Sequence, residues 1–237
     1  MSIALQLAPT GTLRVGIWTT PFFARAHNGA LEGLIPDLGH ELAWRIGVPT
    51  ALSGYANPGG LVAAFRTGAL DVTFVGITAD RAEAIDFGPV VFEIQTTYLV
   101  PASSAIATID EVDRPGVRIA VPAPSAQVAH LKESIAHARL LPVPPENPSV
   151  ALAMLASGEA DAFSHVAPML AAAQGGLPGS RILPGSYFNV PIAIGVAKGR
   201  PAEVVDVARD FAEDVKRSGF AQRAIARARV SGIVVAR

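Results

Sequence analysis

The fold of this chain is indicated by the stretch LVAAFRTGALDVTF (residues 61–74) and by its counterpart VALAMLASGEADAF (residues 150–163). Each stretch has the apolar spacing of a helix, then a glycine, then a short run typical of a strand. The turn in each follows the pattern Gly-x-x-Asp, beginning at Gly68 and again at Gly158. Glycine adopts the left-handed conformation that ends a helix. The repeat predicts two similar α/β lobes that can close around a ligand; the alternative is a chance coincidence of two common turns.

Strands and helices alternate along most of the chain, which predicts a mostly parallel sheet. Outside the repeated stretches, strands are expected at 13–17, 51–53, 94–100, 117–121, 140–143 and 191–196. Helices are expected at 34–46, 79–85, 125–137, 201–218 and 220–229, and one more is opened by Asn147 as its N-cap.

Two extended apolar runs, at 94–100 and 191–196, are expected to connect the lobes. Lobe one then comprises residues 1–97 and 194–237, and lobe two comprises residues 98–193. This predicts an α/β fold with two lobes and two crossover strands.

The composition excludes several classes of function. The 237 residues are 50% hydrophobic, the net charge is -1, and no cluster of Lys or Arg occurs. Nucleic acid is therefore not an expected partner, because phosphate binding needs concentrated positive charge. Cysteine is absent, so no disulfide is expected. The histidines His27, His40, His130 and His137 lack metal-binding spacing and are expected on the surface. No metal and no cofactor are predicted.

The N-terminal residues and the apolar runs bear on localisation. No apolar run approaches the roughly 20 residues that span a bilayer, so direct membrane insertion is not expected. The segment MSIALQLAP (residues 1–9) has no basic residues, and its apolar stretch is too short for a secretory signal. The protein is expected in the periplasm if Met1 replaces a removed export signal, and in the cytoplasm if Met1 is the native start.

Several short motifs occur in an order and spacing that resemble a known family. They are GLIPDL (33–38), Gly68-x-x-Asp71, Gly76-Ile77-Thr78 with Arg81, Ile85-Asp86-Phe87 and Gly158-x-x-Asp161-Ala162. From about residue 13 to residue 220, the chain resembles the bacterial extracellular solute-binding proteins of family 3, the polar amino-acid-binding type. The resemblance implies a Venus-flytrap fold of type II, with the ligand held between two lobes.

The resemblance assigns the ligand's carboxylate to Arg81, after the Gly76-Ile77-Thr78 segment that ends a strand. A guanidinium meets two carboxylate oxygens with two parallel hydrogen bonds; the alternative is a surface arginine. Thr78 adds a hydroxyl and a backbone N–H to the same carboxylate, or it caps the following helix, and both roles are compatible. Relatives usually place two more residues between this threonine and the arginine, so Arg81 is expected to approach from a different angle.

In lobe two, the resemblance assigns contacts to Ser125 and Ala126, where a helix begins. Free N–H groups at a helix start favour an anion; the alternative for Ser125 is a plain cap. Relatives usually carry an aspartate that pairs with the ligand's ammonium, whereas His165 or Val166 stands at that place here. Since an ammonium without an anionic partner is costly to desolvate, we expect a carboxylate ligand without a free α-ammonium. The alternative for His165 is a solvent-facing residue.

Further contacts are predicted around the first strand and the crossover strands. Trp18 and Phe22 occupy a loop where relatives place ligand contacts; the alternative is that these rings, with Phe23, form core. Asn57 stands where relatives have a second aromatic residue. Glu93, and more loosely Tyr187, lie close enough to the crossover strands to reach the ligand.

The main functional prediction is a monomeric solute-binding protein that captures a small carboxylate or amino-acid-like ligand for an ABC transporter permease. A second possibility is a lyase of the same fold, similar to cyclohexadienyl dehydratase. Such a lyase needs a general acid, for which Glu93 and His165 are the available residues. A third possibility is the ligand-binding lobe of a sensor.

Overall fold

The structure, a computed structural model, describes residues 3–145 and 147–237, which divide into two compact units. Unit 1 contains residues up to Glu93, Pro191–Val230 and Val234–Arg237, and unit 2 contains Ile94–Val190 and Ser231–Ile233. The strand β6 (Ile85–Val100) carries the chain from unit 1 into unit 2, and β11 (Phe188–Ala197) carries it back. The prediction of a two-lobed α/β fold with two connecting strands is thereby confirmed.

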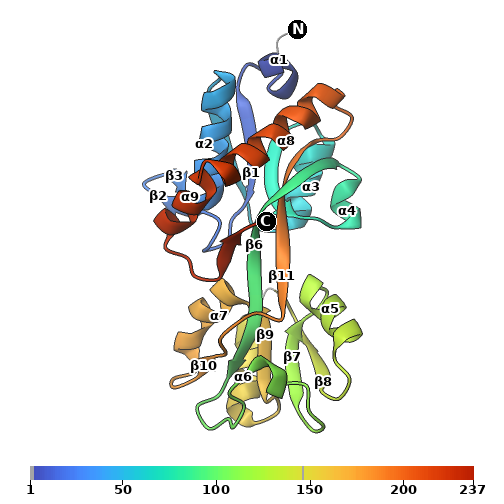
Figure 1. Cartoon of the computed structure of the whole chain (residues 1–237), viewed down its shortest axis with the longest axis vertical. Helices are drawn as coiled ribbons and strands as arrows, with labels where there is room; N and C mark the ends of the chain where they lie inside the picture. The colour runs from blue at the N-terminus through green and yellow to red at the C-terminus, as the bar shows by residue number, and fades with distance from the viewer. Residues whose placement is uncertain (1–2, 146) are drawn as a thin grey trace. The chain divides into compact units, whose positions relative to one another are not determined.

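In unit 1, a sheet is covered by helices (Figure 1). The strands β4 (Thr50–Tyr55), β1 (Leu13–Trp18) and β5 (Val72–Gly76) are parallel neighbours in that order, and β11 runs antiparallel beside β5. The remaining elements are α1 (Ile3–Leu7), β2 (Arg25–His27), β3 (Ala30–Glu32), α2 (Leu34–Ile46), α3 (Pro58–Arg66), α4 (Ala79–Ala82), α8 (Ala202–Arg217) and α9 (Phe220–Ala228). The strand β12 (Ile233–Val235) has residues in both units and pairs with β6.

Unit 2 repeats this arrangement. The strands β8 (Arg139–Val143), β7 (Arg118–Pro122) and β9 (Ala162–Val166) are parallel neighbours, and β6 runs antiparallel beside β9. The other elements are η1 (Ile109–Glu111), α5 (Ala126–Ser134), α6 (Pro148–Ser157), α7 (Ala167–Ala173), η2 (Gln174–Gly176) and β10 (Arg181–Ile182). Since side chains alternate along a strand, Ile119 and Val121 pack with α5 on one face, and Ala120 packs with α6 and α7 on the other.

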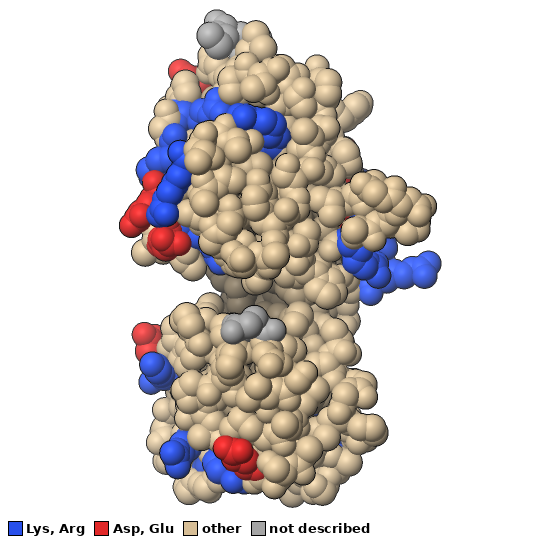
Figure 2. All heavy atoms as spheres, turned by 180° about the vertical axis from the view of Figure 1, so that it is seen from behind, with Lys and Arg blue, Asp and Glu red and all other residues tan. Residues whose placement is uncertain are grey.

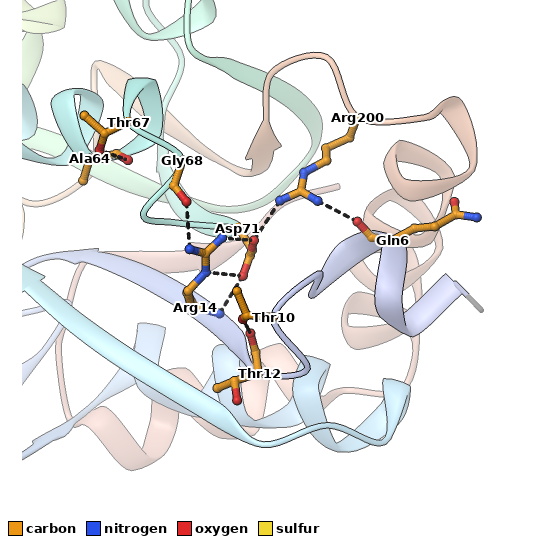
Figure 3. Close-up of polar contacts among 9 residues, drawn as sticks. All are labelled: Gln6, Thr10, Thr12, Arg14, Ala64, Thr67, Gly68, Asp71 and Arg200. Carbon is orange, nitrogen blue, oxygen red and sulfur yellow. Dashed lines mark hydrogen bonds and ion pairs between the residues drawn. The ribbon is translucent and has the colours of Figure 1, made fainter. Parts of the chain in front are cut away.

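The aspartate of each Gly-x-x-Asp turn binds an arginine at the start of the neighbouring parallel strand. In unit 1, Asp71 accepts hydrogen bonds from the Nε, Nη2 and backbone N–H of Arg14 at 2.8–3.0 Å (Figure 3). In unit 2, Asp161 accepts the same three bonds from Arg118 at 2.8–2.9 Å. Each aspartate N–H returns a bond of 2.9 Å to its arginine's carbonyl. The repeated motif therefore fixes equivalent strand pairs in the two units.

These two aspartate–arginine clusters, called clamps below, differ in burial. Arg200 adds a second cation to the cluster of unit 1, binding Asp71 at 2.8 Å and the Gln6 carbonyl of α1 (Figure 3). The side chain of Asp71 is fully buried, whereas that of Asp161 is 34% exposed. Asp71 thus joins three segments of unit 1, and Asp161 joins two of unit 2.

The structure corrects two predicted helices. The helix expected at 79–85 ends at Ala82, and the extended chain of β6 already begins at Ile85. The helix expected at 125–137 ends at Ser134, since the Asp113 carboxylate accepts the N–H groups of Ala136, His137 and Ala138 at 2.8 Å each. Asn147 does stand at the N-cap of α6, although its side chain makes no capping bond.

The hairpin β2–β3 was not predicted. Its turn is formed by Asn28 and Gly29, whose φ angles are 50° and 78°. Asn-Gly in a two-residue turn of this kind is a strong hairpin signal. Within residues 3–145 and 147–237, no helix is long and apolar enough to cross a membrane.

Charged side chains on the surface of unit 1 are mixed in sign. On the face drawn in Figure 2, most atoms belong to uncharged residues, and the basic side chains of unit 1 at the left of the view have acidic ones beside them, whereas those at the right have almost none. Ion pairs on this unit include Arg66–Glu83 at 2.9 Å and Lys198–Asp86 at 2.7 Å. Part of the basic charge is therefore offset locally.

Candidate functional site

The carboxyl ends of the parallel strands in unit 1 bring several predicted residues to one edge of its sheet. Ligands of open α/β sheets bind outside these ends. Trp18 is the last residue of β1 and Gly76 is the last residue of β5. Ile77, Thr78 and Arg81 follow Gly76 directly. This edge is the candidate ligand-binding edge of unit 1.

Arg81 is a half-buried cation at this edge. Its Nη1 donates to the Gly76 carbonyl at 2.6 Å. Burial lowers the pKa of the Arg81 guanidinium, and the nearby charge of Asp80 opposes this shift. Among the residues that the structure describes, no carboxylate forms an ion pair with Arg81, and Asp80 is paired with Arg66. Gly76 therefore orients the guanidinium while most of its donors stay available.

Thr78 has the capping role that the sequence offered as one of its two roles. Its Oγ1 accepts a hydrogen bond from the Arg81 N–H at 3.4 Å at the start of α4. The hydroxyl hydrogen is not used by this bond, so Thr78 can still donate to a ligand. Beside it, the side chain of Ile77 is 48% exposed and adds apolar surface to the edge.

The aromatic residues after β1 divide into surface and core. Trp18 is partly exposed and meets the ring of Phe23 edge-on at 6.2 Å. Phe22 is 6% exposed and packs against Phe23 at 4.6 Å, so these two rings belong to the core of unit 1 in this structure. A contact between Trp18 and a ligand stays a prediction.

Asn57 and Glu93 complete the predicted residues of unit 1. Asn57 caps α3, since its Oδ1 accepts the Gly60 N–H at 2.9 Å. Glu93 lies half-buried on β6, the last residue of unit 1 before the chain enters unit 2. Their contacts with a ligand stay predictions.

Unit 2 presents an equivalent edge at the carboxyl ends of β7 and β9. Ser125 caps α5: its hydroxyl accepts the Val128 N–H at 3.1 Å and donates to the Pro122 carbonyl at 2.5 Å. Both functions of this hydroxyl are thus used within the protein. Ala126 begins α5, and its N–H is one of the first-turn donors that a helix leaves unpaired.

Gln127 is a polar residue of this edge that the sequence reasoning missed. It is 6% exposed, and its amide makes no side-chain hydrogen bond to the described residues but is not enclosed. The available signal was its place in the first turn of α5, two residues after Ser125.

His165 lies on β9 beside Thr97 of β6 and is largely shielded from solvent. Its Nδ1 accepts the Val166 N–H at 2.8 Å, and its ring meets Phe163 edge-on at 5.7 Å. Burial lowers the pKa of His165 to about 4, so the ring is neutral at pH 7. His165 lies in a strand and is partly exposed, so its contact with a ligand stays a prediction.

Aromatic rings form a stack elsewhere in unit 2. His130 lies 4.6 Å from Phe188 and 5.9 Å from Tyr187, and Tyr187 stacks on Tyr98 at 4.7 Å. The Tyr187 hydroxyl and Ser164 Oγ are 2.6 Å apart, and burial raises the pKa of Tyr187. His130 is thus a half-buried packing residue rather than the surface residue expected. Among the described residues, no three His, Asp or Glu side chains group as metal ligands would.

A separate shallow pocket of about 510 Å³ lies in unit 1 between the β2–β3 hairpin and α9. Its charged side chains are largely paired with one another, Arg227 with Asp37 at 2.9 Å and His27 with Glu32 at 3.4 Å. It therefore lacks the half-buried cation without an ion pair that distinguishes the Arg81 edge.

Comparison with known proteins gives one family and many similar folds. The sequence model described as "Bacterial extracellular solute-binding proteins, family 3" matches residues 13–227. No curated protein sequence gives a significant match. Among solved structures, the ancestral amino acid-binding protein AncCDT-1, a precursor of cyclohexadienyl dehydratase, is 24% identical with a TM-score of 0.69, over 96% of this chain and 99% of that one.

Two further structures carry bound amino acids. The AbpA substrate-binding protein of an amino acid ABC transporter from Streptococcus pneumoniae, bound to L-arginine, is 19% identical with a TM-score of 0.66, over 94% of this chain and 96% of that one. An ancestral arginine-binding protein bound to glutamine is 26% identical with a TM-score of 0.65, over 92% of this chain and 97% of that one. These likenesses establish the fold.

Proposed function

This chain belongs to the bacterial extracellular solute-binding proteins of family 3, and from this premise we propose that it binds a small carboxylate through Arg81. The solute is delivered to the permease of an ABC transporter, and the protein acts as a monomer after export from the cytoplasm. Thr78 adds a hydrogen bond to the same carboxylate, and Trp18 with Ile77 supplies apolar surface for the rest of the solute.

The observation that supports this proposal most is the incomplete coordination of Arg81. A guanidinium has five N–H donors, and the described residues give it one acceptor, the Gly76 carbonyl. Removing such a cation from water without a charged partner is costly. A carboxylate that accepts two parallel hydrogen bonds from Arg81 supplies the missing partner.

The solute is proposed to lack a free α-ammonium. An ammonium has three donors and no acceptor, so its binding site needs carboxylates or carbonyl groups. The residues after β7 (122–127) and those at the end of β9 (164–168) include no Asp or Glu. Glu93 is the residue that can oppose this proposal, because it would supply negative charge if it turned toward the solute. The similar structures with bound L-arginine or glutamine indicate the alternative, an amino acid as the solute, which the experiment must test.

The proposed function is solute capture rather than catalysis. A lyase of this fold needs a general acid near the solute. Because burial lowers the pKa of His165 to about 4, its ring is neutral at physiological pH and is poorly suited to protonate a leaving group. Proton NMR of a bound carboxylate after long incubation distinguishes the two functions: capture predicts an unchanged compound, and a lyase predicts an eliminated product.

The test is isothermal titration of pyruvate, lactate, propionate, phenylpyruvate, phenyllactate and phenylpropionate, with alanine and phenylalanine as ammonium-bearing counterparts. Arg81→Lys keeps the charge but loses the two-pronged geometry, so affinity for every bound acid should fall at least tenfold, about 1.4 kcal/mol. Arg223→Lys is the matched control, since Arg223 is exposed on α9 and binds only the Ser218 carbonyl. Unchanged affinity in Arg81→Lys, or binding of the amino acids alone, contradicts the proposal.

A further inference from the structure

Asparagine occurs four times in this chain, and only Asn28 is followed by a glycine, Gly29. The other three are Asn57 and Asn147, each before a proline, and Asn189, before a valine. The backbone nitrogen that follows an asparagine can attack the side-chain amide carbon if it carries a hydrogen and is not hindered. Proline has no backbone N–H, and valine is branched at Cβ, whereas glycine has no side chain at all. Asn28 is therefore the asparagine whose following nitrogen is both available and unhindered.

The structure places Asn28 and Gly29 at the exposed tip of the β2–β3 hairpin. Among the residues that the structure describes, none forms a hydrogen bond with the Asn28 side chain, so its amide is not held away from the following nitrogen. In the same part of the chain, β2 and β3 pair only with each other, through three residue pairs. A two-stranded hairpin is marginally stable by itself, so this turn can open at little cost.

We propose that Asn28 is a site of spontaneous deamidation, with the Gly29 backbone nitrogen as the nucleophile and water as the co-reactant. The Gly29 nitrogen loses its proton to solvent and forms a bond to Cγ of Asn28. The bond from Cγ to the side-chain nitrogen breaks, and that nitrogen takes a proton from solvent and leaves as ammonia. Water then opens the resulting succinimide ring at one of its two carbonyl carbons. The product is an aspartate, or an iso-aspartate whose main chain runs through the former side chain.

The modification changes the hairpin in charge and in shape. Either product adds a negative charge at the tip, beside the shallow pocket that Arg25 and His27 line. Iso-aspartate also adds a methylene group to the main chain, so the two-residue turn cannot keep the geometry that matches the strands. We therefore expect β2 and β3 to lose their register and the exposed Arg25 to become open to proteases that cut after arginine.

The experiment incubates the purified whole protein for several weeks at physiological temperature and mildly alkaline pH, and follows amide loss by peptide mass spectrometry. Trypsin cuts after lysine and arginine, so each asparagine falls in a peptide of its own: 26–45, 46–66, 140–181 and 182–198. The last three peptides are internal controls. Labelling with an isoaspartyl methyltransferase identifies the iso-aspartate.

Two variants are incubated beside the wild type. Asn28→Gln keeps an amide but would have to close a larger ring, so it blocks the reaction. Asn147→Gln is the matched control, because the Asn147 side chain makes no capping bond at the start of α6. Circular dichroism confirms that each protein is folded at the start.

Peptide 26–45 should lose its amide at least about tenfold faster than the other three peptides, which corresponds to a barrier lower by about 1.4 kcal/mol. Asn28→Gln should abolish the methylation signal, and Asn147→Gln should leave it unchanged. Anion exchange should separate a more acidic fraction from the aged wild type, and trypsin should cut the folded protein of this fraction faster after Arg25. Equal cleavage of the two fractions would overturn the loss of register.

Other outcomes overturn the proposal itself. They are an intact amide in peptide 26–45 at the end of the incubation, amide loss at equal rates in the four peptides, and methylation that persists in Asn28→Gln. If a variant fails to fold, the comparison of the four wild-type peptides still decides, because it needs no substitution. None of these outcomes bears on solute capture by Arg81, so the two proposals stand or fall separately.

Discussion

Replacing the aspartate of each clamp should destabilise the protein to very different degrees. Asp71→Asn keeps the shape of the side chain but removes the charge that faces Arg14 and Arg200. Asp71 is fully buried, and breaking a buried ion pair costs about 3–5 kcal/mol. Arg14 and Arg200 are 24% and 20% exposed, so water partly compensates them, and we expect a loss near the lower value, about 3 kcal/mol.

Asp161→Asn is the matched substitution in unit 2. Its ion pair is partly solvated, with the Arg118 and Asp161 side chains 38% and 34% exposed, so we expect a loss of about 1 kcal/mol. Thermal unfolding monitored by circular dichroism measures both. Since about 1 kcal/mol shifts the Tm by ~2–4 °C in a chain of this size, Asp71→Asn should lower the Tm by about 10 °C and Asp161→Asn by about 3 °C. Equal shifts in the two variants would refute the reasoning from burial.

Three further predictions concern the site, the pH dependence and the core. Gly76→Ala places a Cβ 3.3 Å from Arg81 Nη1. The affinity for pyruvate or phenylpyruvate, measured by calorimetry, should therefore fall about tenfold with little change in Tm. An unaltered affinity would count against Gly76 as the group that positions Arg81. Backbone N–H groups of Ala136 and Ala138 hold the pKa of Asp113 below its usual range, so its stabilisation is fully present above about pH 4 and is lost as pH falls further. In urea unfolding, the difference between Asp113→Asn and wild type should therefore be constant from pH 7 to about pH 5 and shrink as the pH falls below about 4. A difference that stays constant in acid would contradict this. Gly16→Ala would bring a Cβ within 2.4 Å of Leu70 Cδ1 and should cost about 1–3 kcal/mol in urea unfolding, whereas Gly175→Ala, with open space around it, should be close to neutral.

The repeated Gly-x-x-Asp pattern was sufficient to predict two α/β lobes, because the glycine and the strand that follows are local features. Its physical role was not readable, since Arg14 and Arg118 reach the aspartates only through the register of neighbouring strands. The same limit explains α5, whose end is set by Asp113 from a distant loop. The β2–β3 hairpin is different, because its Asn28-Gly29 signal is local and was available in the sequence.

The site shows a similar division between local and long-range information. The capping of α4 by Thr78 was readable from adjacent residues. The orientation of Arg81 by the Gly76 carbonyl depends on the turn between β5 and α4, and the tautomer of His165 depends on one hydrogen bond within its own strand end. Neither residue type nor spacing specifies these bonds, so the chemistry of the site required the structure.

The most direct test of carboxylate capture by Arg81 is a crystal structure of the protein with the acid that binds it most tightly in the calorimetric titrations. Our account predicts both carboxylate oxygens at about 2.7–2.9 Å from nitrogens of the Arg81 guanidinium, with the Gly76 carbonyl still bound to Nη1. A carboxylate held elsewhere, with Arg81 bound only to Gly76, would contradict it.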